Sequence, residues 1–143
     1  MGNTQRIALP LRAPDWPSRL AAHFDSRARQ PFAWGSHDCC TFAADGVLAM
    51  TGADHLHDLR GAYDTEMGAA RILARLGGME QAVSARLGPP LHNVALAQRG
   101  DLVLVDAEAG RALAICAGAL AIAPGVAGLQ RVPIAGWRMA WRV

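Results

Sequence analysis

Lysine is absent from this 143-residue chain, and tyrosine occurs only once. All 14 basic side chains are therefore arginines, which face 12 carboxylates and give a formal net charge of +2. The arginines are scattered and form no basic stripe, so specific binding of nucleic acid is not expected. Because alanine is abundant as well, the missing lysine indicates a GC-rich coding bias rather than a function.

Long apolar runs are missing too. No stretch approaches the roughly 20 consecutive apolar residues that cross a bilayer, so no membrane span is expected. Met1 to Arg6 lacks the charged-then-apolar order of a secretory signal, and Arg6 stands where a myristoylation site has Ser or Thr. We expect one domain over residues 1–143, long enough to bury a core without staples.

Predicted helices precede predicted strands along the chain. Asp15 is expected to cap the first helix, and Asp38, or His37 before it, the second, which should stop at Gly52. The predicted helices span residues 16–29, 39–50, 65–76 and 80–87. Short apolar runs separated by Gly and Pro, with a turn at Pro124-Gly125, then favour an antiparallel sheet. The predicted strands span residues 101–106, 111–117, 120–123, 129–133 and 137–142. This order predicts an α+β fold in which N-terminal helices pack on a C-terminal antiparallel sheet.

Residues 34–42 gather an aromatic ring, a glycine, an imidazole, an acid and two of the three cysteines where the second helix begins. A thiol at a helix N-terminus lies beside unpaired N–H groups that favour the thiolate, so Cys39 is a candidate nucleophile. The alternative is that Cys39 and Cys40 are small buried hydrophobes. An odd number of cysteines, two of them adjacent, does not make a disulfide framework and is consistent with a reducing compartment during synthesis.

Two motifs resemble those of a known enzyme group. Trp34-Gly35 followed by Asp38-Cys39 and Phe42, with Arg99-Gly100-Asp101-Leu102-Val103-Leu104 further on, is similar to the NlpC-type branch of the papain-like cell-wall cysteine peptidases. The similarity covers roughly residues 30–123. It implies a papain-like fold, with Cys39 as the nucleophile.

The same resemblance implies a catalytic His on the strand after Gly-Asp-Leu. Here that run reads Ala112-Leu113-Ala114-Ile115-Cys116, so Ala112 stands at the position of the base. The orienting polar residue expected on the following strand falls within 120–123, where every side chain is apolar. Loss of such a base lowers the rate by about 10⁴-fold or more, so little or no catalysis is predicted.

The remaining histidines offer substitutes. His55 and His57, in the predicted loop after the second helix, are the candidate replacement bases if Cys39 is a nucleophile. His37 is too close in sequence to approach the thiol as a base on a strand would. His23 and His92 are expected to be surface or capped imidazoles.

A metal site is an alternative use of the cysteines. His37, Cys39, Cys40 and Cys116 make a conceivable four-ligand set, since the strand of Cys116 should lie over the helix start. Adjacent cysteines lack the usual spacing between ligands, so no metal and no cofactor are predicted. Trp34 is expected to pack against the second helix.

The whole-chain pattern resembles a small family of proteins encoded in phage and prophage tail modules. It combines the 34–42 motif with Leu59-Arg60-Gly61-Ala62-Tyr63, the Arg-Gly-Asp-Leu run and a final Ala140-Trp141-Arg142. The resemblance implies a structural tail-tip or tail-assembly protein of long-tailed phages or gene transfer agents. Its implied partners are other tail-tip or hub proteins and peptidoglycan, and its implied location is the virion after synthesis in the host cytoplasm. The alternative is an active cysteine peptidase that cleaves peptidoglycan stem peptides during cell entry, with Cys39 as nucleophile.

Overall fold

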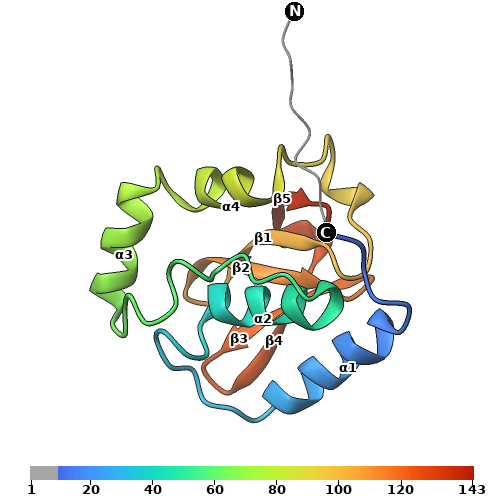
Figure 1. The fold of residues 1–143 in the computed structure, drawn as a ribbon, viewed down its shortest axis with the longest axis horizontal. Helices are drawn as coiled ribbons and strands as arrows, with labels where there is room; N and C mark the ends of the chain where they lie inside the picture. The colour runs from blue at the N-terminus through green and yellow to red at the C-terminus, as the bar shows by residue number, and fades with distance from the viewer. Residues whose placement is uncertain (1–9) are drawn as a thin grey trace, which may run out of the picture.

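The computed structural model describes residues 10–143, so the expectations that rest on Met1 to Arg6 lie outside the described residues. The described part has four α-helices and a five-stranded antiparallel sheet, which confirms the predicted α+β class (Figure 1). The helices are α1 (Trp16–Arg27), α2 (Cys39–Thr51), α3 (Glu66–Arg75) and α4 (Met79–Leu87). The strands are β1 (Leu102–Ala107), β2 (Gly110–Cys116), β3 (Leu120–Gly125), β4 (Gly128–Pro133) and β5 (Trp137–Trp141). Within these residues no helix has the length and apolar character that spanning a bilayer requires.

The strands are arranged in the order β4-β3-β2-β1-β5, so the last strand returns to the free side of β1. The turn predicted at Pro124-Gly125 is wrong by two residues. Both residues belong to β3, and Gly125 pairs with Gly128 across the turn. Strand β3 continues through Pro124 and Gly125, although a Pro-Gly pair is usually typical of a turn.

A register shift between β1 and β5 places the two C-terminal tryptophans on different faces of the sheet. Leu102 lies opposite Trp141, but Val105 lies opposite Trp137 because the pairing slips between Leu104 and Val105. Trp141 is fully buried against the helices, whereas Trp137 packs with Val105 on the other face. Both rings are buried, so neither forms an exposed binding surface.

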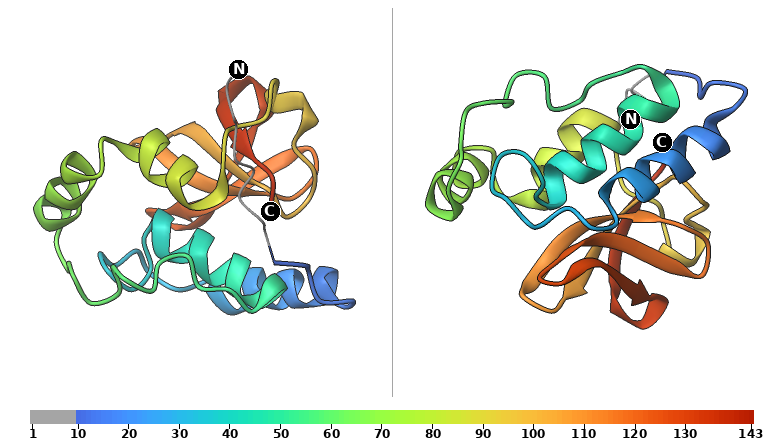
Figure 2. Two further views of the ribbon diagram at one scale, coloured as in Figure 1. Left: turned by 45° about the horizontal axis from the view of Figure 1, so that its top comes forward. Right: turned by 90° about the horizontal axis from the view of Figure 1, so that it is seen from below.

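Helices α1 and α2 lie side by side, and α2 packs against β2 and β3 (Figure 2). Leu20 of α1, Phe42 and Val47 of α2 and Ile115 of β2 meet in this core. Asp15 makes no side-chain cap of α1, contrary to expectation, because its carboxylate bonds to Arg19 instead. The core therefore fixes the start of α2 against the middle of the sheet.

Candidate functional site

Asp38 fixes the start of α2. Its Oδ1 accepts a hydrogen bond from the backbone N–H of Thr41 at 2.9 Å, and the Thr41 hydroxyl accepts one from the backbone N–H of Asp38 at 2.9 Å. Its Oδ2 accepts from the Gly35 N–H at 2.8 Å and from the Tyr63 hydroxyl at 2.7 Å. The prediction that Asp38 caps this helix is confirmed, and the alternative cap, His37, is wrong.

The loop between α2 and α3 contacts the turn at Gly35, just before the start of α2. Gly35 has a φ of +85°, and a Cβ at this position would meet the carbonyl oxygen of Tyr63. Only glycine combines that backbone conformation with so close an approach. The Gly35 turn and the Tyr63 loop are thus in direct contact, and both bond to Asp38.

The two adjacent thiols lie in a group of three sulfur atoms. Cys39 Sγ is 4.0 Å from Cys40 Sγ, and Cys40 Sγ is 3.8 Å from Met79 Sδ of α4. The contact with the Cys40 thiol lowers the pKa of Cys39, and the backbone N–H of Leu113 acts in the same direction. The pKa of Cys40 is raised by the same contact and by burial. Cys39 therefore carries the more readily formed thiolate.

Strand β2 presents Leu113, not Ala112, to the helix start. Leu113 belongs to the same core cluster as Cys39, while Ala112 packs against the cluster on the opposite face of the sheet. The placement of Ala112 opposite the thiol is wrong because alternate strand residues face opposite sides of a sheet. Since both side chains are apolar, β2 supplies no base at either position.

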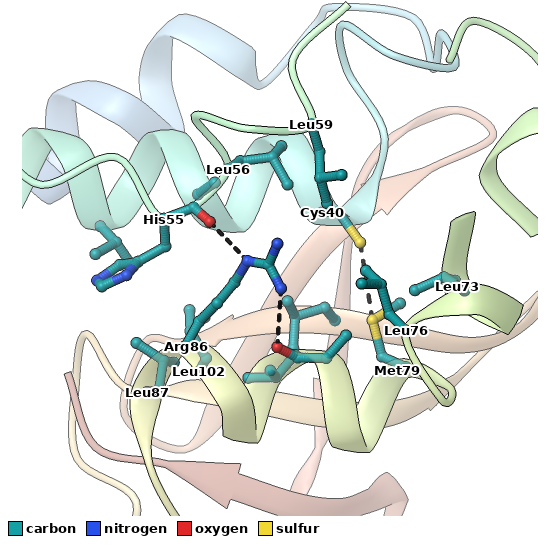
Figure 3. A pocket seen from close by; sticks show the side chains of 15 residues that line it. Cys40, His55, Leu56, Leu59, Leu73, Leu76, Met79, Arg86, Leu87 and Leu102 are labelled. Atoms are coloured by element: carbon teal, nitrogen blue, oxygen red, sulfur yellow. Dashed lines mark hydrogen bonds between the residues drawn. The ribbon is translucent and has the colours of Figure 1, made fainter. Parts of the chain in front are cut away.

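The candidate replacement bases are not joined to Cys39. Among residues 10–143, no hydrogen bond links an imidazole to its thiol, whose partner is Cys40. His55 lines the same cavity as Cys40, but the two side chains lie at opposite ends with Arg86 between them (Figure 3). Burial lowers the pKa of His55, and His57 is exposed on the loop.

Two other histidines are buried near α2. His23 is buried, and its Nε2 donates to the carbonyl oxygen of Phe42 at 2.9 Å, so of the two alternatives expected for it, a surface or a capped imidazole, it is not the surface one. His37 is fully buried, with Nδ1 3.5 Å from a guanidinium nitrogen of Arg27, and its Nε2 has no hydrogen-bond partner among residues 10–143. His92 is exposed, as expected.

The alternative four-ligand metal set of the sequence analysis is not assembled. Within residues 10–143, His, Cys, Asp and Glu side chains form no group of three or more that could hold a metal ion. Cys116 lies in the cluster on the far face of the sheet from Cys39, and its thiol donates to the carbonyl oxygen of Gly118. The alternation of side chains along β2 separates it from the helix start. All three cysteines are free thiols.

An apolar cavity of about 80 Å³ adjoins Cys40 (Figure 3). Leucines of the loop, of α3 and of the sheet form its walls, together with Met79. Arg86 crosses it, donating from Nε to the carbonyl oxygen of His55 at 2.9 Å and pairing with Asp58 at 2.9 Å. Nothing in the cavity but Arg86 and the ring of His55 carries a side-chain nitrogen.

Trp34 lies in the segment before α2, where its ring contacts Phe32. It is 36% exposed and meets the edge of Phe32, with 4.9 Å between ring centroids. Phe32 and Val126, which is 83% exposed, line a shallow hollow between the 31–34 segment and the β3–β4 turn. This surface was not predicted from the sequence, because the position of Trp34 just before α2 is also compatible with a buried ring.

Comparison with protein families matches residues 11–143 to a family described as Domain of unknown function (DUF6950). The chain matches no curated protein.

Proposed function

The chain belongs to the DUF6950 family, and we propose that it is a structural component of a phage tail tip or tail-assembly complex, built on a papain-like, NlpC-type scaffold with little or no peptidase activity. The resemblance of the 34–42 and 99–104 motifs supports this ancestry. The position of Cys39, at the first turn of a helix that packs on an antiparallel sheet, agrees with it. The observation that carries the proposal is the apolar wall of β2 opposite the thiol.

A cysteine peptidase needs a base that takes the thiol proton and returns it to the leaving amine. The Cys39 thiol meets the Cys40 thiol and the backbone of Leu113, and none of these groups transfers a proton at neutral pH. Loss of the base of a triad costs about 10⁴-fold or more in rate. The surroundings of Cys39 therefore support a retained scaffold rather than a working site.

Exposed apolar side chains support a role in assembly. Phe32 and Val126 line one hollow, Trp34 packs edge to face on Phe32, and all three side chains are exposed. Aromatic residues are enriched at protein interfaces, where an edge-to-face pair offers a rigid contact. We place the contact with a neighbouring tail protein on this surface.

The test is complementation of a phage or gene transfer agent from which the coding sequence is deleted. Wild type and Cys39→Ala are both expected to restore infectious particles, and the protein should be found in the purified tails by mass spectrometry. Trp34→Ala should reduce its incorporation. Loss of infectivity in Cys39→Ala, with normal incorporation of the variant, would overturn the structural role in favour of catalysis.

The lowered pKa of Cys39 favours a second candidate, the active peptidoglycan stem-peptide peptidase with Cys39 as nucleophile and His55 or His57 as base. Such an enzyme should cleave purified peptidoglycan, and the activity should disappear in Cys39→Ala but persist in Cys116→Ala. Incubation of the purified wild-type chain with peptidoglycan, followed by chromatography of the released peptides, decides between the two candidates.

A further inference from the structure

Three sulfur atoms from two helices meet at one end of the apolar cavity. Cys39 and Cys40 come from the first turn of α2, and Met79 is the first residue of α4. Cys40 Sγ is 4.0 Å from Cys39 Sγ and 3.8 Å from Met79 Sδ. Figure 3 shows Cys40 and Met79 directed toward one another across the cavity.

The two separations from Cys40 Sγ match those of a metal ion bound by three sulfurs. Metal–sulfur bonds of about 2.3 Å in a trigonal plane place the sulfur atoms about 4 Å from one another. Two thiols and one thioether are soft ligands, which suit Cu(I) and not the hard cations Mg(II) or Ca(II). We propose that Cys39, Cys40 and Met79 form a binding site for a soft monovalent cation of the Cu(I) or Ag(I) type.

The charge balance of this site is favourable. Binding releases one proton from each thiol, so that two thiolates and one monovalent ion leave a net charge of −1 and no electron is transferred. The N-terminus of α2 and the guanidinium of Arg86 both oppose that charge. Arg86 already lowers the pKa of Cys40, against the effects of Cys39 and of burial.

The site is also reachable and selective. Cys40 and Met79 are both only partly buried, and both line the cavity. Leu59, Leu73 and Leu76 surround the approach, so a hard, strongly hydrated cation finds no oxygen ligands to replace its water. Met79 could not be found from cysteine spacing, since it lies 39 residues from Cys40.

The test is anaerobic titration of the full chain with Cu(I) in competition with a chromophoric chelator. We expect one Cu(I) per chain, and Met79→Leu, which conserves side-chain volume, should remain folded. Even partners outside the ligand shell are worth about 10–100-fold in metal affinity, so Met79→Leu should weaken binding by at least about tenfold. Cys39→Ser and Cys40→Ser should weaken it further, while Cys116→Ser is the control and should bind as wild type does.

X-ray absorption at the copper edge supplies a readout that does not depend on affinity. Wild type is expected to show three sulfur neighbours, and Met79→Leu two. Equal affinity of wild type and Met79→Leu, two sulfur neighbours in the wild-type protein, or equal weakening by Cys116→Ser would each overturn the site. The outcome is independent of the tail-protein role, because it is measured on the isolated chain.

Discussion

Tyr63 and Asp38, 25 residues apart in the chain, are joined by a hydrogen bond of 2.7 Å from the phenol hydroxyl to Oδ2. The same oxygen accepts from the Gly35 N–H, and Asp38 is only 2% exposed. One carboxylate therefore holds together the Gly35 turn, the start of α2 and the loop that precedes α3. Because Cys39 is the first residue of α2, this junction determines where Cys39 lies.

Replacing Tyr63 by Phe should destabilise the protein while leaving the helix cap in place. A hydrogen bond to a buried charged group is worth about 1.5–3 kcal/mol, and Asp38 would lose one of its donors. Urea denaturation followed by far-UV circular dichroism should show a fall of that size in the free energy of unfolding. A change below about 0.5 kcal/mol would mean that the junction is held by Gly35 and Thr41 alone.

Tyr63 is the only tyrosine, so its ionisation is directly observable at 295 nm. Burial raises its pKa above the ordinary value of 10.0, and donation to Asp38 raises it further. The folded state then holds the phenol proton where the unfolded state releases it, so stability falls as the pH rises above about 10. We expect no phenolate signal at pH 10.5 in the folded protein, and a signal there would contradict the bond to Asp38.

Gly35→Ala should be far more harmful than Gly61→Ala. Both glycines have positive φ, at +85° and +77°, so each substitution carries backbone strain of about 1–3 kcal/mol. A Cβ at Gly61 meets nothing within 4 Å, whereas one at Gly35 would meet the Tyr63 carbonyl. Chemical denaturation of the two variants isolates the close approach, and equal losses of stability would show that the loop and the turn are not in contact.

The helices could be predicted because their signals are local. Asp38 and Gly52 bracket α2, and Thr65 caps α3, each through contacts within four residues of the chain. The strands followed from short apolar runs, except where Pro124 continued β3 through an apparent turn. The order of β5 beside β1 was not predictable, because pairing between strands 30 residues apart leaves no local signature.

Of the site, the sequence predicted the helix start that carries Cys39, but not the residues that surround its thiol. The place of Cys39 at a helix start followed from the capping pattern, but its surroundings depend on packing. Which of Ala112 and Leu113 faces the thiol is set by the register of β2, and Met79 reaches Cys40 only through the placement of α4. The burial of His23 arises from the packing of α1 on α2, which helical periodicity does not specify.

Arg12→Ala should cost more than Arg19→Ala. Arg12 bonds to the carbonyl oxygens of Val143 and Arg99 and pairs at 3.1 Å with Asp101, which is 1% exposed. Removing one partner of a buried pair costs about 3–5 kcal/mol, which is lessened here because two backbone N–H groups also donate to Asp101. We expect a loss of about 2–4 kcal/mol in urea denaturation.

Arg19 provides the matched control for that experiment. It pairs with Asp15 on the exposed side of α1, where an ion pair is worth about 0–1 kcal/mol. Arg19→Ala should therefore be nearly neutral. If both variants lose the same stability, Arg12 does not connect the two ends of the described chain in solution.

The histidines beside α2 should make the protein less stable in mild acid. Burial lowers the pKa of both His23 and His37 below the ordinary value of 6.5, and the positive charge of Arg27 adds to the effect on His37. The unfolded chain then binds more protons than the folded chain at a pH just below 6.5. Since stability falls with falling pH wherever the unfolded state binds more protons, the urea midpoint should be lower at pH 5.5 than at pH 7.5.

Substituting single histidines should show which imidazoles cause this pH dependence of stability. The decrease in midpoint should be smaller in His37→Gln, because one buried imidazole no longer needs to stay neutral in the folded state. It should not vanish, since His23 remains and burial lowers the pKa of His55 as well. His92→Gln, at an exposed position, should keep the wild-type dependence. If the midpoint falls equally in His37→Gln and wild type, His37 takes up its proton while it stays buried. Its Nε2, which has no partner among residues 10–143, would then need a hydrogen-bond acceptor.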